Sequence, residues 1–188
     1  GKKCRCVGCL MGKSVKKKFD KVRKSKYRQH RPLAQIDSDF LGPIRPESIR
    51  RHRYGMLIMC PRTNLFWAIP LRHKSDNTEK MREVLQEIRA RWGKTIGDRV
   101  LHYVRTDNEA VWDGNFLRFL RSNGIISLRP SPYSPQANGK IERQVRQVVA
   151  ALRSSMLGVC PRLWCFAMEN LAMVWRRAYI NKSGRTPI

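Results

Sequence analysis

Three short apolar segments near the start of the chain, separated by turn-forming residues, constrain the fold more than any other feature. Residues 33–40, 54–60 and 65–71 are rich in large apolar side chains and have the length of ordinary strands. Residues 61–64, with the sequence Pro-Arg-Thr-Asn, form a turn signal between the second and third segments. The sequence therefore predicts three consecutive strands that pair as an antiparallel meander.

Helix and strand patterns alternate after this meander. Ser75 suits the N-cap position of a helix over residues 76–92, in which apolar side chains recur at helical spacing. Residues 100–106 then predict a strand, residues 115–122 a short helix, and residues 125–129 a fifth strand. The order β-β-β-α-β-α-β indicates an α/β domain.

A proline-rich segment interrupts the alternation. Residues 131–135, with the sequence Ser-Pro-Tyr-Ser-Pro, contain two prolines that remove backbone donors and fix the chain. We expect an exposed loop there, followed by one amphipathic helix over residues 137–157 and another over residues 163–179. The aromatic side chains of the last helix are interpreted as packing residues.

The balance of charges indicates a polyanionic partner. The 188 residues include 39 Lys and Arg but only 14 Asp and Glu, which gives a formal net charge of +25. Such chains bind phosphate backbones, because neutralising the phosphates releases condensed counterions. A ribosomal-type structural protein, or a basic surface that is merely solvated, would have a similar composition. No apolar run approaches the roughly 20 residues that are needed to cross a bilayer.

The first 31 residues differ from the rest, since they carry 13 Lys or Arg against a single acid, Asp20. This composition is typical of a basic linker, and its cluster over residues 16–26 fits either a nuclear-import signal or a segment that rests on DNA. Cys6 and Cys9 have the spacing of a zinc-binding pair, which supplies half of a tetrahedral site; two incidental cysteines are the alternative. Because the chain begins with Gly and its six cysteines are irregularly spaced, we expect a fragment of a longer polypeptide from a reducing compartment.

Three acids lie at the ends of predicted elements in a chain where acids are scarce. Asp39 ends the first strand, Asp107 follows the fourth, and Glu142 lies on the first turn of the helix after the proline-rich loop. Carboxylates from separate elements can hold divalent cations, and two such ions roughly 4 Å apart promote in-line phosphoryl displacement. Taken singly, Asp107 fits a turn residue and Glu142 a salt-bridge partner of Arg146. Asp37 shares a strand face with Asp39, so alternation does not decide between them.

Three short motifs, in this order, resemble the catalytic core of retroelement integrases, in particular those of copia-type LTR retrotransposons. They are Asp39-Phe40-Leu41-Gly42-Pro43, Thr106-Asp107-Asn108 and Ser134-Pro135-Gln136-Ala137-Asn138-Gly139-Lys140-Ile141-Glu142-Arg143. The resemblance covers most of residues 4–188 and implies a ribonuclease H-like α/β fold, with a mixed five-stranded sheet flanked by helices. It also implies that Asp39, Asp107 and Glu142 are the catalytic, metal-binding triad, since Asp39 rather than Asp37 stands in the Asp-x-x-Gly-Pro pattern.

The same resemblance implies an enzyme of DNA integration, a metal-dependent polynucleotidyl transferase and endonuclease. It would process the 3′ ends of retroelement DNA and join them to target DNA, with Mg²⁺ or Mn²⁺ on the triad. In the full-length protein, Zn²⁺ would be held by Cys6, Cys9 and two histidines before residue 1. We further expect a homo-multimer, an origin in a polyprotein and action in the nucleus. The residues expected to contact DNA are Gln136, Asn138, Lys140, Arg143 and Arg146.

The resemblance divides the chain into residues 1–31, the C-terminal half of a zinc module plus linker, and residues 32–188, the catalytic core. Three departures from the family pattern are visible, and one is Val149, which stands where a second basic residue would follow Arg146 by one helical turn. The 34 residues between Asp107 and Glu142 are one fewer than usual, and residues 59–62 lack the family's acidic, aromatic turn. Two other functions stay open: a catalytically decayed remnant that still binds nucleic acid, and a transposase or nuclease of the same fold.

Overall fold

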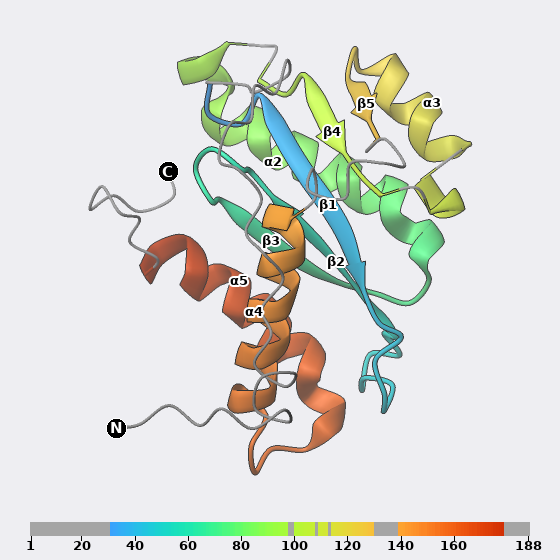
Figure 1. Cartoon of the computed structure of the whole chain (residues 1–188), viewed down its shortest axis with the longest axis vertical. Helices are drawn as coiled ribbons and strands as arrows, with labels where there is room; N and C mark the ends of the chain where they lie inside the picture. Colours follow the sequence, from blue (N-terminus) through green and yellow to red (C-terminus); the bar gives the residue numbers. More distant parts are fainter. Residues whose placement is uncertain (1–30, 98–99, 108, 113, 130–138, 179–188) are drawn as a thin grey trace, which may run out of the picture.

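One mixed sheet organises the computed structural model, which describes residues 31–97, 100–107, 109–112, 114–129 and 139–178. The strand order across the sheet is β3-β2-β1-β4-β5 (Figure 1). The first three strands pair antiparallel, whereas β4 runs parallel to β1 and β5 parallel to β4. The predicted meander and the mixed five-stranded sheet are therefore confirmed. The strands are β1 Gln35–Leu41, β2 Tyr54–Met59, β3 Phe66–Leu71, β4 Tyr103–Arg105 and β5 Ile126–Leu128.

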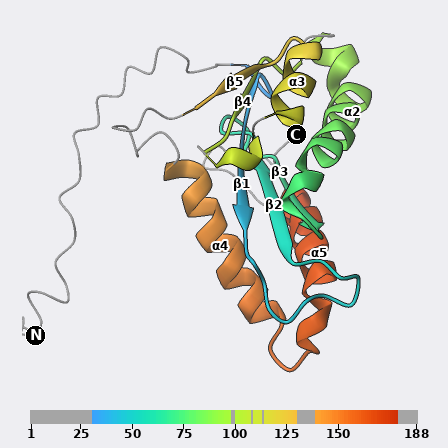
Figure 2. The ribbon, with the colours of Figure 1, turned by 90° about the vertical axis from the view of Figure 1, so that its right-hand side faces the viewer.

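Helices cover both faces of this sheet. Figure 2 shows α4 on the opposite side of β1 from α2 and α3. The helices are α2 Asn77–Ile96, α3 Asn115–Ser122, α4 Gly139–Ser155 and α5 Trp164–Ala178. Short 3₁₀ turns, which the sequence patterns did not predict, are η1 Lys74–Asp76, η2 Ala110–Trp112 and η4 Pro161–Leu163. No helix in the described parts of the chain combines the length and the apolar character that a membrane crossing requires.

Two hydrophobic cores lie on opposite faces of the sheet. Along β2, Met56 and Ile58 enter the core beneath α2 and α3, while Leu57 and Met59 enter the core beneath α4 and α5. Because both faces of β2 are covered, this strand has a nearly continuous run of apolar residues instead of an alternation. The second core fixes the position of α4 through buried side chains such as Ile141.

The end of α2 and the start of β4 differ from the predicted boundaries for identifiable reasons. Helix α2 was expected to end at Trp92 but continues through Gly93, which a helix tolerates at a modest cost. It ends at Gly97, whose φ of +93° leaves the helical region and whose N–H donates to Gly93 O. Strand β4 is shorter than predicted because its pairing with β1 begins only at the contact between Gln35 and Tyr103.

Strand β1 ends at a position that requires glycine. Gly42 has φ +119°, and a Cβ built on it would lie 2.9 Å from Arg53 O. The strand runs one residue past the predicted end, to Leu41, so Asp39 lies within the strand and not at its last position. The chain can then turn sharply just beyond the acid.

The segment that follows β1 is tied to the junction between α4 and α5. Trp164 Nε1 donates a hydrogen bond of 3.0 Å to Pro46 O. The backbone N–H of Ile49 donates to Arg162 O at 2.8 Å. These two bonds hold the junction at the C-terminal end of α4 beside the loop that follows β1.

Candidate active site

Two aspartate side chains of β1 point to the face of the sheet that α4 covers. In the antiparallel register, Asp37 lies opposite Met59 and Asp39 lies opposite Leu57. Met59 and Leu57 both belong to the core beneath α4 and α5. Since residues opposite each other in a sheet point to the same face, Asp37 and Asp39 lie on the face that α4 covers.

The parallel pairing of β1 with β4 brings the second predicted acid to the same edge. The register matches Asp37 with Arg105. Asp39 lies two residues after Asp37 in β1, and Asp107 lies two residues after Arg105, just beyond the end of β4, so the two acids follow paired positions of adjacent strands.

The two aspartates of β1 differ in their partners. Asp37 is buried, with 1% of its surface exposed, and its Oδ1 accepts a hydrogen bond of 2.7 Å from Gln35 Nε2. Its Oδ2 lies 4.0 Å from the guanidinium of Arg105. Asp39 is half-buried, and its Oδ1 accepts a bond of 2.7 Å from the backbone N–H of Phe40. Asp37 is thus a buried, paired side chain, whereas Asp39 is the more accessible one.

Asp39 interacts with the negative charges of other acids. Its pKa is raised from 3.8 to about 6, chiefly because burial takes its charge out of water. The hydrogen bond from Phe40 N–H lowers the pKa and so opposes this rise. The negative charges that add to the rise are, in decreasing order, those of Asp107, Glu109 and Glu142. The three predicted acids therefore interact electrostatically across three separate elements.

Asp107 is held by hydrogen bonds from the turn that follows it. Trp112 Nε1 donates to Asp107 Oδ1 at 2.6 Å, and the backbone N–H of Glu109 donates to the same oxygen at 3.2 Å. The Glu109 carboxylate forms an ion pair with Lys74. Trp112 and Glu109 were missed in the sequence, where the one available signal was a large aromatic residue within five positions of Asp107.

Glu142 projects from the first turn of α4 and is exposed. Its neighbour Ile141, 2% exposed, fixes this turn in the core beneath the sheet. Between described residues, no ion pair joins Glu142 to Arg146, so the salt-bridge alternative finds no support there. Within the described ranges, no three His, Cys, Asp or Glu side chains are grouped closely enough to hold one metal ion.

The remaining predicted residues divide into those that the structure describes and those that it does not. Arg143 and Arg146 lie exposed on α4, one and four positions after Glu142. Lys140 belongs to the same helix, but its side chain lies outside the described parts. Four further predicted residues also lie outside the described residues: Cys6, Cys9, Gln136 and Asn138.

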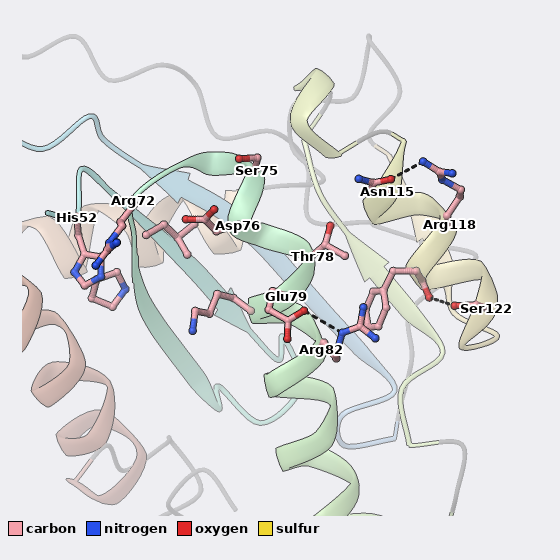
Figure 3. A pocket seen from close by; sticks show the side chains of 14 residues that line it. His52, Arg72, Ser75, Asp76, Thr78, Glu79, Arg82, Asn115, Arg118 and Ser122 are labelled. Atoms are coloured by element: carbon pink, nitrogen blue, oxygen red, sulfur yellow. Dashed lines mark hydrogen bonds and ion pairs between the residues drawn. The ribbon is translucent and has the colours of Figure 1, made fainter. Parts of the chain in front are cut away.

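A cleft of about 890 Å³ lies elsewhere on the molecule, between the end of β3, the start of α2, and α3 (Figure 3). Its wall carries charges of both signs, including Glu79 and Arg82, which pair at 3.2 Å. The residues that line it do not include Asp39, Asp107 or Glu142. The cleft is therefore separate from the candidate active site.

Comparison with known proteins shows a similarity in sequence to a retrotransposon polyprotein. No protein-family model matches the chain. The chain is 27% identical over 186 residues to the Retrovirus-related Pol polyprotein from transposon TNT 1-94 of tobacco, Nicotiana tabacum. The match covers 97% of the chain and 13% of the polyprotein, so the chain spans only a small part of that relative.

Solved structures identify the fold. The catalytic core domain of BIV integrase superposes with a TM-score of 0.58 at 15% identity, covering 82% of this chain and 91% of that one. The simian T-cell lymphotropic virus intasome gives a TM-score of 0.70 at 13% identity, covering 97% and 61%. The dimeric form of the HTLV-2 integrase catalytic core gives 0.58 at 16% identity, covering 83% and 94%. The chain thus has the ribonuclease H-like fold of retroviral integrase catalytic cores, and its match to a retrotransposon polyprotein confirms the resemblance to retroelement integrases that its motifs indicated.

Proposed function

We propose that this chain is the catalytic core of an enzyme of DNA integration, a divalent-metal-dependent polynucleotidyl transferase. Its activity would be to process the 3′ ends of retroelement DNA and to join those ends to target DNA. One observation carries the proposal: the pairing of β1 with β4 brings Asp39 and Asp107 to the same edge of the sheet, where α4, the helix of Glu142, covers the face to which Asp39 points. Acids gathered in this way are costly to a fold unless a cation or a proton neutralises them.

The oxygen donors of these three acids fit a hard divalent cation in their chemistry, while the described side chains are not grouped around one ion position. Mg²⁺ and Mn²⁺ prefer oxygen ligands, and Mg²⁺ is bound through one or two carboxylates together with water and substrate phosphates. Asp39, Asp107 and Glu142 offer carboxylate oxygens from a strand, a strand end and a helix start. The HTLV-2 integrase catalytic core, which has the same fold, has been solved in complex with magnesium, which supports divalent metal use here.

Each acid has a distinct role in this proposal. When bound, the metal ions would activate an attacking oxygen, first of water and then of a DNA 3′-hydroxyl, and stabilise the leaving oxygen. Asp39 and Asp107 would contribute carboxylates from adjacent parallel strands. Glu142 would complete the donor set from α4, where its side chain is exposed next to the buried Ile141 that fixes the first turn. The raised pKa of Asp39 means that part of its population is protonated near neutral pH, so metal binding would release that proton.

The basic side chains beside the acids fit a DNA partner. Arg143 and Arg146 are exposed on the helix that carries Glu142, and the whole chain has a net charge of +25. These two arginines would contact backbone phosphates, which position DNA without reading its sequence. We extend the same role to Gln136, Asn138 and Lys140.

The wider setting is also part of the proposal. Neighbours of the same fold include an intasome and dimeric and trimeric integrase cores, which supports a multimer that holds DNA. We propose residues 1–31 as half of a zinc module, with Cys6 and Cys9 as ligands, plus a linker, residues 32–188 as the core, and the nucleus as the place of action. The match to 13% of a polyprotein supports an origin in a longer chain.

The decisive experiment measures strand transfer by a longer protein that contains this chain. Asp107→Asn and Glu142→Gln should each abolish Mg²⁺- and Mn²⁺-dependent cutting and joining while leaving salt-sensitive DNA binding intact. Activity that persists in Asp107→Asn would refute the assignment. DNA binding without metal-dependent chemistry in the unmodified protein would instead identify a decayed remnant, and cutting without joining would identify a nuclease of the same fold.

A further inference from the structure

Within the described residues, a buried tryptophan donates the shortest hydrogen bond to any proposed metal ligand. Trp112 is 0% exposed in the turn η2, and its indole Nε1–H donates to Asp107 Oδ1 at 2.6 Å. A hydrogen bond from a neutral donor to a carboxylate is stronger than one between neutral groups. We propose that Trp112 is a positioning residue, which fixes the Asp107 carboxylate for metal binding; this inference rests on the function proposed above.

The hydrogen bonds determine which oxygen of Asp107 faces a cation. The indole of Trp112 and the backbone N–H of Glu109 both donate to Oδ1. Neither uses Oδ2, so a carboxylate held in this way offers Oδ2 to the metal. The side chain has one rotatable carboxylate, and two donors on a single oxygen define its orientation. Trp112 therefore acts on the metal through Asp107 and does not need to contact it.

The indole ring also connects Asp107 to Asp39. It stacks on Phe40 with ring centroids 4.4 Å apart and 20° between the planes. The backbone N–H of that same Phe40 donates to Asp39 Oδ1 at 2.7 Å. The indole also makes an edge-on contact with Phe116, with ring centroids 4.9 Å apart. One rigid, fully buried ring thus packs against the residue that holds one acid and bonds directly to the other.

The expected effect is on metal affinity. Outer-shell hydrogen bonds to metal ligands typically contribute 10- to 100-fold to affinity, because they fix the orientation of the ligand before the metal arrives. Trp112→Phe keeps an aromatic ring at the buried site but removes the N–H donor. We expect this substitution to weaken Mn²⁺ binding at the acids by about tenfold or more.

The chain supplies a matched control. Trp67 is also buried, 3% exposed, and its Nε1–H donates to the carboxylate of Glu87 at 2.8 Å. Trp67→Phe therefore makes the same chemical change at a carboxylate that is not among the proposed ligands. A general loss of packing or of folding would appear in both variants, whereas a loss of metal affinity is expected only in Trp112→Phe.

The first measurement is calorimetric titration of the 188-residue chain with Mn²⁺. Unmodified chain, Trp112→Phe and Trp67→Phe are compared, together with Asp39→Asn and Glu142→Gln. Thermal unfolding in chelator first establishes that each variant is folded. We expect Trp67→Phe to bind Mn²⁺ with the same affinity as the unmodified chain and Trp112→Phe to bind it about tenfold more weakly. The two acid variants should have the lowest affinity.

A second measurement needs no variant that might unfold. In a ¹H–¹⁵N spectrum of the unmodified chain, the five tryptophans give five indole signals. The signal of Trp112 is assigned through its proximity to the Phe40 ring. Addition of Mg²⁺ should shift this signal, since its acceptor becomes a metal ligand, while the Trp67 indole signal should stay in place.

The outcomes separate this inference from the proposed function. If Mn²⁺ affinity depends on Asp39 and Glu142 but is the same in Trp112→Phe as in the unmodified chain, the positioning role is refuted and the function stands. An indole signal of Trp112 that does not move with Mg²⁺ would refute the role in the same way. If the chain binds no Mn²⁺, or binds it equally in Asp39→Asn and Glu142→Gln, the proposed function fails and the role of Trp112 with it.

Discussion

Neutralising Asp39 should make the metal-free protein more stable at neutral pH. The pKa of this carboxyl is raised from 3.8 to about 6 by burial and by neighbouring acids, so its ionised form is disfavoured in the fold. Each pKa unit corresponds to 1.36 kcal/mol, so the whole shift would destabilise the fold with ionised Asp39 by about 3 kcal/mol. Asp39 is only half-buried, and screening by solvent reduces this figure to about 1–2 kcal/mol.

The direction of the pH dependence follows from the same values. Because the pKa is higher in the folded than in the unfolded chain, the protonated carboxyl contributes stability that is fully present below about pH 4. That stability is lost as the pH rises through about 6. Asp39→Asn removes the charge yet keeps an oxygen that can accept the bond from Phe40 N–H. The variant should therefore be more stable than the unmodified chain above pH 7, and the difference should vanish below pH 4.

The assay is thermal unfolding in chelator across pH 4 to 8, and in Mg²⁺ at pH 7.5. At pH 7.5 in chelator, Asp39→Asn should unfold about 2–8 °C higher, given 2–4 °C for each kcal/mol in a domain of this size. Mg²⁺ should raise the unfolding temperature of the unmodified chain and not that of the variant.

Asp37→Asn is the matched control for this experiment. Asp37 lies two residues away on the same face, but it is buried against Gln35 and Arg105. Loss of its charge should destabilise the fold by about 1–3 kcal/mol, because Arg105 loses a buried anionic partner. A lower unfolding temperature for Asp39→Asn at pH 7.5 in chelator, or a gain at pH 4 as large as that at pH 7.5, would refute the reasoning.

Two further predictions follow from the geometry. Gly42→Ala should destabilise the fold by about 1–3 kcal/mol in urea unfolding, because its φ is +119° and its Cβ would meet Arg53 O, whereas Gly93→Ala, with open space around it, should stabilise by about 0.5–1 kcal/mol. A neutral result at Gly42 would mean that the turn can relax. Arg143→Ala and Arg146→Ala should each weaken DNA binding and reduce the slope of log affinity against log salt by about 1. Arg89→Ala, exposed on α2 beneath the opposite face of the sheet, should change the slope less, and equal losses in all three variants would contradict a DNA site at α4.

The sequence predicted the elements well because their signals are local. The strands β2 and β3 are bounded by turn residues, and the apolar residues of α4 recur at helical spacing within the helix itself. The end of α2 was misjudged at Gly93 because a single glycine inside a helix costs less than the tertiary contacts of the helix provide. The fold and the resemblance to integrases could therefore be predicted from the chain alone.

The partners within the site could not be predicted, since they depend on register and on side-chain direction. Asp37 and Asp39 are equivalent by alternation, and only the pairing of β1 with β4 matches Asp37 to Arg105. Trp112 lies in a 3₁₀ turn that has no distinctive sequence pattern. Its bond to Asp107 exists because that turn folds back over the end of β4.

The two hydrogen bonds that fasten the loop after β1 to the junction beyond α4 have a mechanical consequence. They anchor the segment that follows the C-terminal end of α4, while Glu142 sits near the opposite end of the helix. A helix of 17 residues is a rod about 25 Å long. Pivoting such a rod by about 5° about its anchored end moves the other end by about 2 Å, which is the length of one bond between Mg²⁺ and oxygen. A tilt of this size, small enough for the packing of Ile141 to absorb, would carry the Glu142 carboxylate into or out of contact with an ion at the proposed site of Asp39 and Asp107.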